Sequence, residues 1–191
     1  MKSITVKEVM VPLEEYATVG EDATLIDAVM ALEKAQMEFN QKRYRHRAVL
    51  VLDEKNHIIG KISQHDVIKA LEPHYQKIRL REQGALNRFG LSDFFIKAAM
   101  KEYSFWDKPL QNLCEKAVGQ KVKDFMYMPS QGEFVEENAT MDEAIHRLII
   151  GEHHSLLVTK GKEIVGVLRL TDVFEMVFKA LKSCVFETSR L

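Results

Sequence analysis

Residues 60–67 read GKISQHDV, and a related stretch, GVLRLTDV, returns at residues 166–173. Each stretch follows a short apolar run that ends in glycine, and each places an aspartate six residues after that glycine. An apolar strand that leads directly into a helix needs side chains that satisfy the free backbone N–H groups of the first helical turn. The recurrence of this arrangement indicates that the chain contains one structural unit twice.

The repeat continues on the N-terminal side of both stretches. VKEVM at 6–10 matches VKDFM at 122–126, and VGEDATLIDAVMAL at 19–32 matches VEENATMDEAIHRL at 135–148. Both pairs are offset by 116 positions, whereas the two glycines are offset by 106. The first copy therefore carries ten additional residues, which we place between Glu33 and Arg47. A repeat of this length determines the organisation of the whole fold.

Each copy predicts the element order β-α-β-β-α. The predicted fold class is therefore mixed α/β (α+β), with two such units. Asp22 and Asn138 stand where helix N-caps are expected, and apolar residues then recur at three- and four-residue spacing. Two β-like runs joined by turn-forming residues predict a hairpin, and a second helix closes each copy, ending before Pro73 in the first. The predicted helical stripes are Leu25, Val29, Leu32 and Gln36, and Met141, Ile145 and Leu148; the predicted hairpins pair AVLVL with HIIGKI, and SLLVT with EIVGVL.

The segment between the copies has no counterpart in the repeat. It contains SDFFIKAAMKEY and WDKPLQNLCEKAV, which predict helices that open at Ser92 and Asp107. We interpret its aromatic cluster as core rather than as a ligand site. The chain is thus divided into a first unit (1–72), a helical insertion (73–121), a second unit (122–183) and a C-terminal tail (184–191).

Composition excludes several classes of function. With 27 basic and 28 acidic residues, the chain has a formal net charge of −1 and no overall field that attracts nucleic acid or an anionic membrane. We interpret the basic run QKRYRHR at 41–47 as a solvated insertion, although nucleic-acid binding through it is an alternative. No apolar run approaches the roughly 20 residues of a membrane span, and no signal peptide precedes the first unit, so we expect a cytoplasmic protein. The two cysteines lie far apart, and adjacent His153 and His154 would face opposite sides of a strand, so no metal site is expected.

Ser63 and Asp66 allow two interpretations. Their spacing is that of a capping box, in which the hydroxyl and the carboxylate satisfy N–H groups at a helix start. The same helix start can also bind an anion, and a carboxylate beside it can accept hydrogen bonds from a ribose diol. Spacing alone does not choose between these roles.

The repeat as a whole resembles a pair of CBS domains, the tandem known as a Bateman module. The resemblance rests on VKEVMVP, IIGKISQHDV, VKDFMYMP and IVGVLRLTDV in their expected places, and it does not cover the insertion. It implies two units packed as a pseudo-twofold pair, with clefts that bind adenosine nucleotides such as AMP, ADP or ATP, or S-adenosylmethionine. It also implies that a Ser/Thr-x-x-Asp motif at the strand-to-helix junction holds ribose and phosphate.

Carried onto this chain, that motif corresponds fully to Ser63 and Asp66. The second copy keeps Asp172 but has Arg169 at the hydroxyl position. Arg169 either contacts a phosphate or fills the cleft with its bulk, so we expect two unequal sites. The resemblance further implies basic groups facing the phosphates at Arg45, His46, Arg47, His153 and His154, and an adenine pocket lined by backbone near Thr18, Val19 and Val135.

The sequence thus predicts a non-catalytic regulatory module that binds an adenosine nucleotide and signals by a conformational shift. No nucleophile or other catalytic companion accompanies the two aspartates, so we expect no enzymatic activity. We expect a homodimer that forms through the CBS units, and an effector protein that contacts the helical insertion. The alternative is an interaction scaffold that has lost nucleotide binding.

Overall fold

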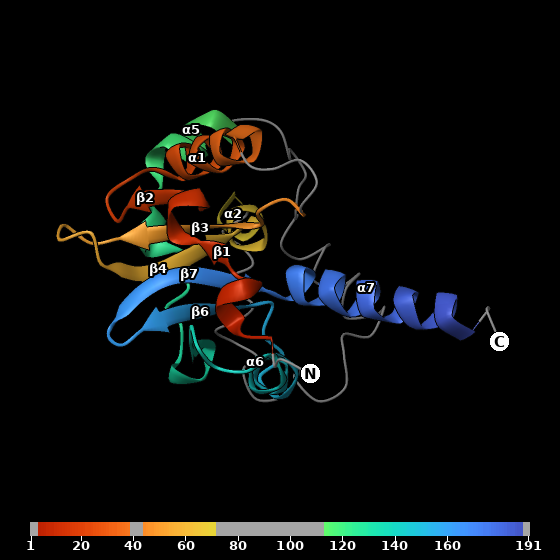
Figure 1. Cartoon of the computed structure of the whole chain (residues 1–191). Helices are drawn as coiled ribbons and strands as arrows, with labels where there is room; N and C mark the ends of the chain where they lie inside the picture. Colours follow the sequence, from red (N-terminus) through yellow and green to blue (C-terminus); the bar gives the residue numbers. More distant parts are fainter. Residues whose placement is uncertain (1–3, 39–43, 72–112, 189–191) are drawn as a thin grey trace, which may run out of the picture.

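The computed structural model describes residues 4–38, 44–71 and 113–188 (Figure 1). Within these ranges the chain forms two separate sheets, each accompanied by its own helices, as expected for a mixed α+β fold with two repeated units. The helix predicted to open at Ser92 lies outside the described residues. The helix predicted to open at Asp107 is described only in its C-terminal part, which is helical as α5 (Leu113–Gly119).

The first sheet has the strand order β2-β3-β4, with β2 parallel to β3 and β3 antiparallel to β4. Helices α1, α2 and α5 lie together on one side of the molecule, next to this sheet (Figure 1). We call β2, α1, β3, β4 and α2 the first unit. Their bounds, with α5, are β2 (Thr18–Gly20), α1 (Leu25–Glu38), β3 (Ala48–Leu52), β4 (Ile58–Ser63), α2 (Gln64–Leu71) and α5 (Leu113–Gly119).

The second sheet has the order β1-β7-β6-β5, in which β5 is parallel to β6 and the other neighbours are antiparallel. We call β5, α6, β6, β7 and α7 the second unit. Helix α7 leaves the end of β7 and extends away from both sheets (Figure 1). The bounds are β1 (Val11–Pro12), β5 (Phe134–Glu136), α6 (Met141–Ile150), β6 (Ser155–Lys160), β7 (Glu163–Arg169) and α7 (Leu170–Thr188).

In each unit, the edge of the sheet pairs with a chain segment that lies just before the other unit in the sequence. Strand β1 precedes the first unit but pairs with β7, and Tyr127 precedes the second unit but bridges to Lys61 of β4. The buried side chains follow the same exchange, because Val6 belongs to the core of the second unit and Val122 to the core of the first. This crossing of segments ties the two units into one body.

The exchange explains the repeated glycines. A Cβ on Gly166 would lie 2.5 Å from the carbonyl oxygen of Val11, and one on Gly60 would lie 2.7 Å from Sδ of Met126. Both contacts come from the crossing segments. The glycines therefore permit close approach of backbone within a sheet, and neither forms part of an anion-binding turn.

The two predicted hairpins are confirmed, and their registers define the equivalence of the units. Ala48 pairs with Ser63 in the first, and Ser155 pairs with Arg169 in the second. Each hairpin turn contains a residue with positive φ, Asn56 at 61° and Gly161 at 63°. Arg169 thus occupies the position in the second unit that Ser63 occupies in the first.

The predicted N-caps Asp22 and Asn138 are wrong, because both helices begin further along the chain. Helix α1 is capped by Thr24, whose hydroxyl accepts from Asp27 N (3.3 Å) while the Asp27 carboxylate accepts from Thr24 N (2.8 Å). The equivalent cap of α6 is Thr140. The predicted stripe also fails at Val29, which is exposed, since Ala28 takes the inward position of α1.

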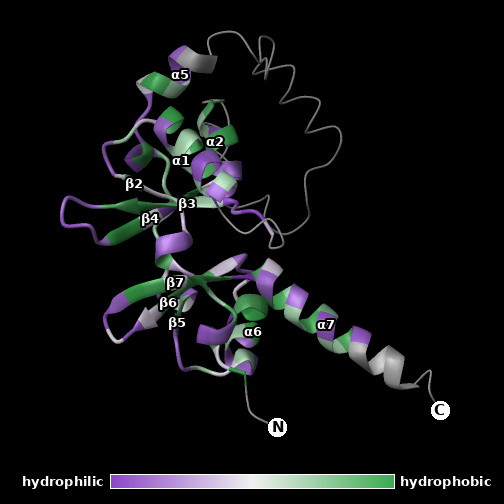
Figure 2. Cartoon of the chain, turned by 45° about the horizontal axis from the view of Figure 1, so that its top comes forward, coloured by the Kyte–Doolittle hydropathy of each residue, from purple (hydrophilic) through white to green (hydrophobic). Residues whose placement is uncertain are grey.

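Three apolar clusters stabilise the fold. One lies inside each unit, and the third joins the two sheets through Val11, Leu50, Leu157 and Val167. Apolar residues accordingly concentrate in the central strands of both sheets, whereas the hairpin turns are hydrophilic (Figure 2). Among the described helices, none has the length and apolar character that crossing a membrane requires.

Candidate functional site

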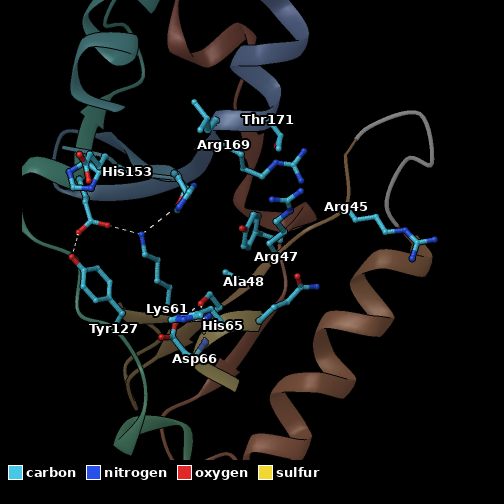
Figure 3. Close-up of a pocket in the computed structure, with 18 residues that line it drawn as sticks. Arg45, Arg47, Ala48, Lys61, His65, Asp66, Tyr127, His153, Arg169 and Thr171 are labelled. Atoms are coloured by element: carbon cyan, nitrogen blue, oxygen red, sulfur yellow. Dashed lines mark hydrogen bonds and ion pairs between the residues drawn. The ribbon is translucent and has the colours of Figure 1, made fainter. Parts of the chain in front are cut away.

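A cavity of about 510 Å³ lies between the two units, where β4 runs into α2 and β7 runs into α7 (Figure 3). Both strand-to-helix junctions that the repeat singled out contribute to its wall. The lining residues also come from the chain just before β3 and just before β6, which carries most of the basic side chains. The lining includes Tyr16, Arg45, Arg47, Lys61, Ser63, His65, Asp66, Tyr127, Glu133, His153, His154, Ser155, Arg169, Leu170 and Thr171.

Ser63 and Asp66 form a capping box and line the cavity at the same time. The Asp66 carboxylate accepts from the Ser63 hydroxyl (2.6 Å) and from Ser63 N (3.0 Å), and Ser63 Oγ accepts from Asp66 N (3.2 Å). One carboxylate oxygen, Oδ2, makes both bonds to Ser63, so the other oxygen has no part in the box. The capping and binding interpretations are therefore compatible in geometry.

Basic side chains surround this junction. Arg47 lines the cavity, and its carbonyl accepts a hydrogen bond from Gln64 N at the start of α2 (2.9 Å). His154 has the equivalent place in the second unit, where its carbonyl accepts from Leu170 N (3.0 Å). Within residues 4–38, 44–71 and 113–188, no ion pair involves Arg45 or Arg47. This end of the cavity therefore offers positive charge to an anion.

The second junction is closed by an internal ion pair. The guanidinium of Arg169 donates from Nε (2.5 Å) and Nη2 (2.7 Å) to the two carboxylate oxygens of Asp172. Its Nη1 donates to the Tyr44 carbonyl (2.7 Å). Both side chains of the pair are buried, and Asp172 does not line the cavity. The carboxylate that would receive a ribose in the second unit is thus already bound.

Tyr16 and His46 complete the closed end. Their rings meet edge to face with centroids 4.6 Å apart, and His46 Nδ1 lies 3.4 Å from Arg169 Nη1. Burial raises the pKa of the Tyr16 hydroxyl to about 12. Figure 3 shows Arg47 extending toward Arg169, whereas Arg45 points away from the group. Arg47 therefore lies between the basic end of the cavity, at Ser63 and Asp66, and the closed end, at Arg169 and Asp172.

Another ion pair, at the cavity wall, joins the two units to each other. Lys61 Nζ of β4 donates to Glu133 Oε2 (2.6 Å), and Tyr127 Oη donates to Glu133 Oε1 (2.6 Å). Ser130 N also donates to Oε1 (3.0 Å). Glu133 is only 2% exposed. Its carboxylate is thus removed from water but fully hydrogen-bonded, as a buried charge must be.

The pKa of Glu133 reflects this environment. Burial raises the pKa, but the hydrogen bonds from Lys61 and Tyr127 outweigh burial and lower it from 4.5 to about 2. Glu133 is therefore ionised at neutral pH and holds Lys61 across the boundary between the units. The pair contributes to how the two units are placed around the cavity.

His153 reaches the cavity through an unusual loop. Its ring lies directly over Gly151, where a Cβ would approach His153 Nε2 to 2.1 Å, and beside Gly132 at 3.7 Å. Glu152, between them, has a φ of 50°, in the left-handed region that non-glycine residues rarely adopt. The loop before β6 therefore places the His153 imidazole at the cavity wall, because Gly151 leaves space for the ring and Glu152 adopts a left-handed conformation.

The structure distributes the predicted site residues unevenly. Those that line the cavity are Ser63, Asp66, Arg45, Arg47, His153, His154 and Arg169. His46 and Asp172 are buried behind the wall. Thr18 and Val19 lie on β2 and Val135 on β5, and none of the three lines the cavity.

Sequence reasoning missed Tyr16, Lys61, Tyr127 and Glu133. Lys61 had a weak signal, because it is a single charged residue inside an otherwise apolar strand. Glu133 had another, because Ser130-x-x-Glu133 has the spacing of a capping box. Neither pattern indicates that the two side chains meet.

The family of this chain follows from a comparison with known protein families. The family model of the CBS domain matches residues 6–73 and again residues 122–179, which together make up more than half of the sequence. The chain belongs to the CBS-domain family and carries two CBS units. Proteins with such pairs are generally regulatory modules. No curated protein matches the chain.

Solved structures share the fold at low sequence identity. CBSX2, a CBS-pair protein from Arabidopsis thaliana, is 18% identical with a TM-score of 0.59, over 95% of this chain and 99% of that one. A CBS-domain protein of unknown function from Kribbella flavida is 18% identical with a TM-score of 0.57, over 92% and 98%. A structure of CBSX2 in complex with AMP is 17% identical with a TM-score of 0.55, over 92% and 97%.

Among the described residues, no group of three or more His, Cys, Asp or Glu side chains is arranged to hold a metal ion.

Proposed function

We propose that this chain is a regulatory module that binds one adenosine nucleotide, of the AMP, ADP or ATP class, at the Ser63–Asp66 end of the cavity. The observation that carries the proposal is the position of that capping box: its hydroxyl and carboxylate line a cavity whose wall also carries Arg47. A carboxylate suits a ribose diol, and a guanidinium suits a phosphate. The AMP complex of the similar CBSX2 structure supports this ligand class.

Several polar groups on the cavity wall suit the parts of a nucleotide. The start of α2 lies at the cavity wall next to Ser63. Gln64 N and Asp66 N already donate to the Arg47 carbonyl and to Ser63 Oγ, but the positive end of the helix dipole still favours an anion there. Arg47 adds a cation that forms no ion pair with an acidic side chain within residues 4–38, 44–71 and 113–188. His65 and His154 offer further donors on the same wall. A phosphate at this end would meet several donors, and its ribose would lie toward Asp66.

The second junction does not provide an equivalent site. Arg169 occupies both oxygens of Asp172, so a ribose could bind there only by displacing a buried bidentate ion pair. Displacing one partner of such a pair costs about 3–5 kcal/mol, more than the hydrogen bonds of a ribose diol return. We therefore propose one nucleotide per chain.

Binding would act by linkage. The cavity is built from both units, so a ligand in it changes the relative stability of their arrangements by the difference in its affinity for them. We propose that the resulting shift, typically about 1–3 kcal/mol, is read by a partner protein in the cytoplasm and that the chain itself catalyses no reaction. Residues 73–121, which have no counterpart in the repeat, are the proposed contact for that partner.

A second candidate function is an interaction scaffold that binds no nucleotide. The observation in its favour is that both aspartates already have internal partners, Asp66 in its capping box and Asp172 with Arg169. Under this hypothesis the cavity is only a gap between the two units.

Titration calorimetry with AMP, ADP, ATP and S-adenosylmethionine separates the two functions. The proposal expects saturable binding of an adenosine nucleotide with a stoichiometry of one. A ligand at 100 times its Kd should also stabilise the fold by about 2.7 kcal/mol in a thermal-shift series. If millimolar nucleotide gives neither heat nor a change in Tm, the scaffold is the better description.

The site is tested by Asp66→Ala with a matched control. Loss of the carboxylate should weaken nucleotide affinity roughly 10- to 100-fold, the range of one or two hydrogen bonds to a charged group. Asp27→Ala removes the corresponding carboxylate from the capping box of α1, away from the cavity, and should leave affinity unchanged. Equal losses in the two variants would mean that Asp66 acts only as a cap.

Arg169→Ser tests the closed junction, because it gives the second copy the Ser-x-x-Asp pattern of the first. Removing the guanidinium frees the Asp172 carboxylate and opens space at the start of α7. The expected result is a second bound nucleotide per chain. A stoichiometry that stays at one would refute the assignment of Arg169 as the closing residue.

A further inference from the structure

The cavity has a polar wall that the proposed phosphate and ribose contacts do not use. Its side chains are those of Lys61, Tyr127, Glu133, His153 and Ser155. In Figure 3, Tyr127 and His153 lie on one side of the cavity and Arg47 lies on the opposite side, while the Lys61 side chain extends toward the first side. This wall is therefore separate from the basic end that suits a phosphate.

The register of the first hairpin places this wall on the far side of the ribose contacts. Ser63 pairs with Ala48, directly after Arg47, whereas Lys61 pairs with Leu50. Arg47 and Lys61 thus lie on opposite sides of Ser63 along the hairpin. Lys61 and Ser63 are two residues apart in β4, so their side chains share one face of the strand, with Cα atoms about 6.5 Å apart. A ligand with its phosphate at Arg47 and its ribose at Ser63 would bring its base toward Lys61.

The adenine pocket that the family resemblance implied does not meet this cavity. Thr18 and Val19 of β2 and Val135 of β5 do not line it. A base bound in the cavity therefore takes its polar contacts from other residues of the wall.

The carboxylate of Glu133 retains an acceptor position. Among the described residues, its Oε1 accepts from the Tyr127 hydroxyl (2.6 Å), from Ser130 N (3.0 Å) and from Ser130 Oγ (3.3 Å), whereas its Oε2 accepts only from Lys61 Nζ (2.6 Å). A carboxylate oxygen offers about two acceptor positions, so one remains on Oε2. Because Glu133 is ionised at neutral pH, this oxygen can accept a hydrogen bond but cannot donate one.

The ammonium of Lys61 retains a donor beside that acceptor. Within the described ranges, Nζ donates to Glu133 Oε2 and to Ser155 Oγ (3.5 Å). An ammonium has three N–H donors, so one remains. The wall therefore presents an acceptor and a donor next to each other, on a salt bridge that joins the two units.

Adenine has the complementary pair of groups. Its exocyclic N6 amino group donates, and the adjacent ring nitrogen N7 accepts. Tyr127 and His153 place two aromatic rings on the same wall, and aromatic side chains stack on bases. The wall can thus contact both the edge and the face of the base.

We propose that the Lys61–Glu133 pair is the base-binding subsite of the cavity, where Glu133 Oε2 accepts from the amino group of adenine and Lys61 donates to the neighbouring ring nitrogen. The subsite rests on the proposed nucleotide function and names the residue that selects the base. It also gives the ion pair a second role. A base bound there contacts both units at once, through Lys61 of β4 and Glu133 before β5.

Titration calorimetry of the full chain with two ligands tests the subsite. AMP carries the amino group, and purine riboside 5′-monophosphate lacks only that group. Loss of one hydrogen bond to a charged acceptor should weaken binding roughly 10- to 100-fold. The wild-type chain should therefore prefer AMP by at least about 10-fold. This comparison needs no variant, so it tests the subsite even if a substitution at Glu133 does not fold.

Glu133→Gln tests the assignment of the acceptor. Ser130 N donates to Oε1, so the amide should keep its oxygen there and place its nitrogen, a donor, where Oε2 lies. The preference for AMP should fall below about 3-fold, because the amino group then faces a donor. A purely structural role would weaken both ligands equally and leave the preference unchanged. Circular dichroism and Tm establish that the variant is folded.

Glu152→Gln is the matched control. Glu152 also lines the cavity, and the substitution removes the same charge without touching the Lys61–Glu133 pair. The preference for AMP should stay within about 3-fold of the wild-type value. A similar fall in both variants would mean that the charge of the cavity, and not the acceptor at Glu133, sets the preference, and would overturn the proposal.

The remaining outcomes separate the subsite from the nucleotide function. A wild-type chain that binds one AMP but binds purine riboside 5′-monophosphate equally well would overturn the subsite and leave the proposed function standing. A preference for AMP that persists in folded Glu133→Gln would place the amino group elsewhere, with the same consequence. If neither nucleotide binds at millimolar concentration, both the subsite and the proposed function are wrong.

Discussion

The ion pair between Lys61 and Glu133 should be a main determinant of how firmly the two units are held together. Its perturbation is Lys61→Met, which keeps the aliphatic stem of the side chain and removes the ammonium. Glu133 would then keep the hydrogen bonds from Tyr127 and Ser130 but lose the cation that lies 2.6 Å from Oε2. A buried carboxylate without its countercharge is strongly unfavourable.

The magnitude follows from the pKa of Glu133, which falls from 4.5 to about 2 in the folded chain. A difference of this size corresponds to about 3 kcal/mol of stability at neutral pH, at 1.36 kcal/mol per pKa unit. Lys61 is a main contributor, so we expect Lys61→Met to lower the free energy of unfolding by about 2–3 kcal/mol. For a chain of this length that is a fall in Tm of roughly 4–12 °C.

The assay is urea denaturation at neutral pH, with a double-mutant cycle. Glu133→Gln alone should cost less, about 1 kcal/mol, because Lys61 can turn toward water. The double variant should be more stable than the sum of the single effects predicts by about 1–2 kcal/mol, because it leaves no unpaired buried charge. Additive effects, or a loss below about 0.5 kcal/mol in Lys61→Met, would refute the reasoning.

The pH dependence gives an independent check with a definite sign. Because folding lowers the pKa of Glu133, its contribution is present above about pH 4.5 and is lost as the pH falls toward 2. The wild-type chain should therefore lose stability over this window more steeply than Glu133→Gln does. Equal slopes in the two proteins would show that Glu133 is not held ionised.

Two further predictions concern the sheets and the closed junction. Gly166→Ala should lower the free energy of unfolding by about 1–3 kcal/mol, because the new methyl group meets the Val11 carbonyl oxygen at 2.5 Å. The control is Gly20→Ala, which has open space around it and should change the free energy of unfolding by less than about 1 kcal/mol in the same urea titration. Arg169→Met should lower the free energy of unfolding by about 3–5 kcal/mol, because it leaves the buried Asp172 carboxylate without its cation. Adding Asp172→Asn should recover part of this loss. An Arg169→Met variant as stable as wild type in thermal unfolding would contradict this account.

Local patterns were sufficient for much of the fold. The matching stretches of the two copies predicted two units, and alternation between turn residues and β-like runs predicted both hairpins with their ends nearly correct. The strand-to-helix junctions at Ser63 and Arg169 were also located by spacing alone. The helix caps were misplaced by two residues, because Asp22 and Asn138 are as suitable for capping as Thr24 and Thr140, and only the tertiary position of the chain selects between them.

The sequence by itself determined that one unit occurs twice, the order of strands and helices within each unit, and that the second junction departs from the first. Only the tertiary structure decided why the glycines are needed, that Arg169 is bound to Asp172 and the Tyr44 carbonyl, and that Lys61 meets Glu133 across 72 positions of sequence. The physical reason is that hydrophobic periodicity and capping act within a few residues and are visible as patterns. Contacts between crossing segments depend on how two units pack, and no periodic pattern in the chain records them.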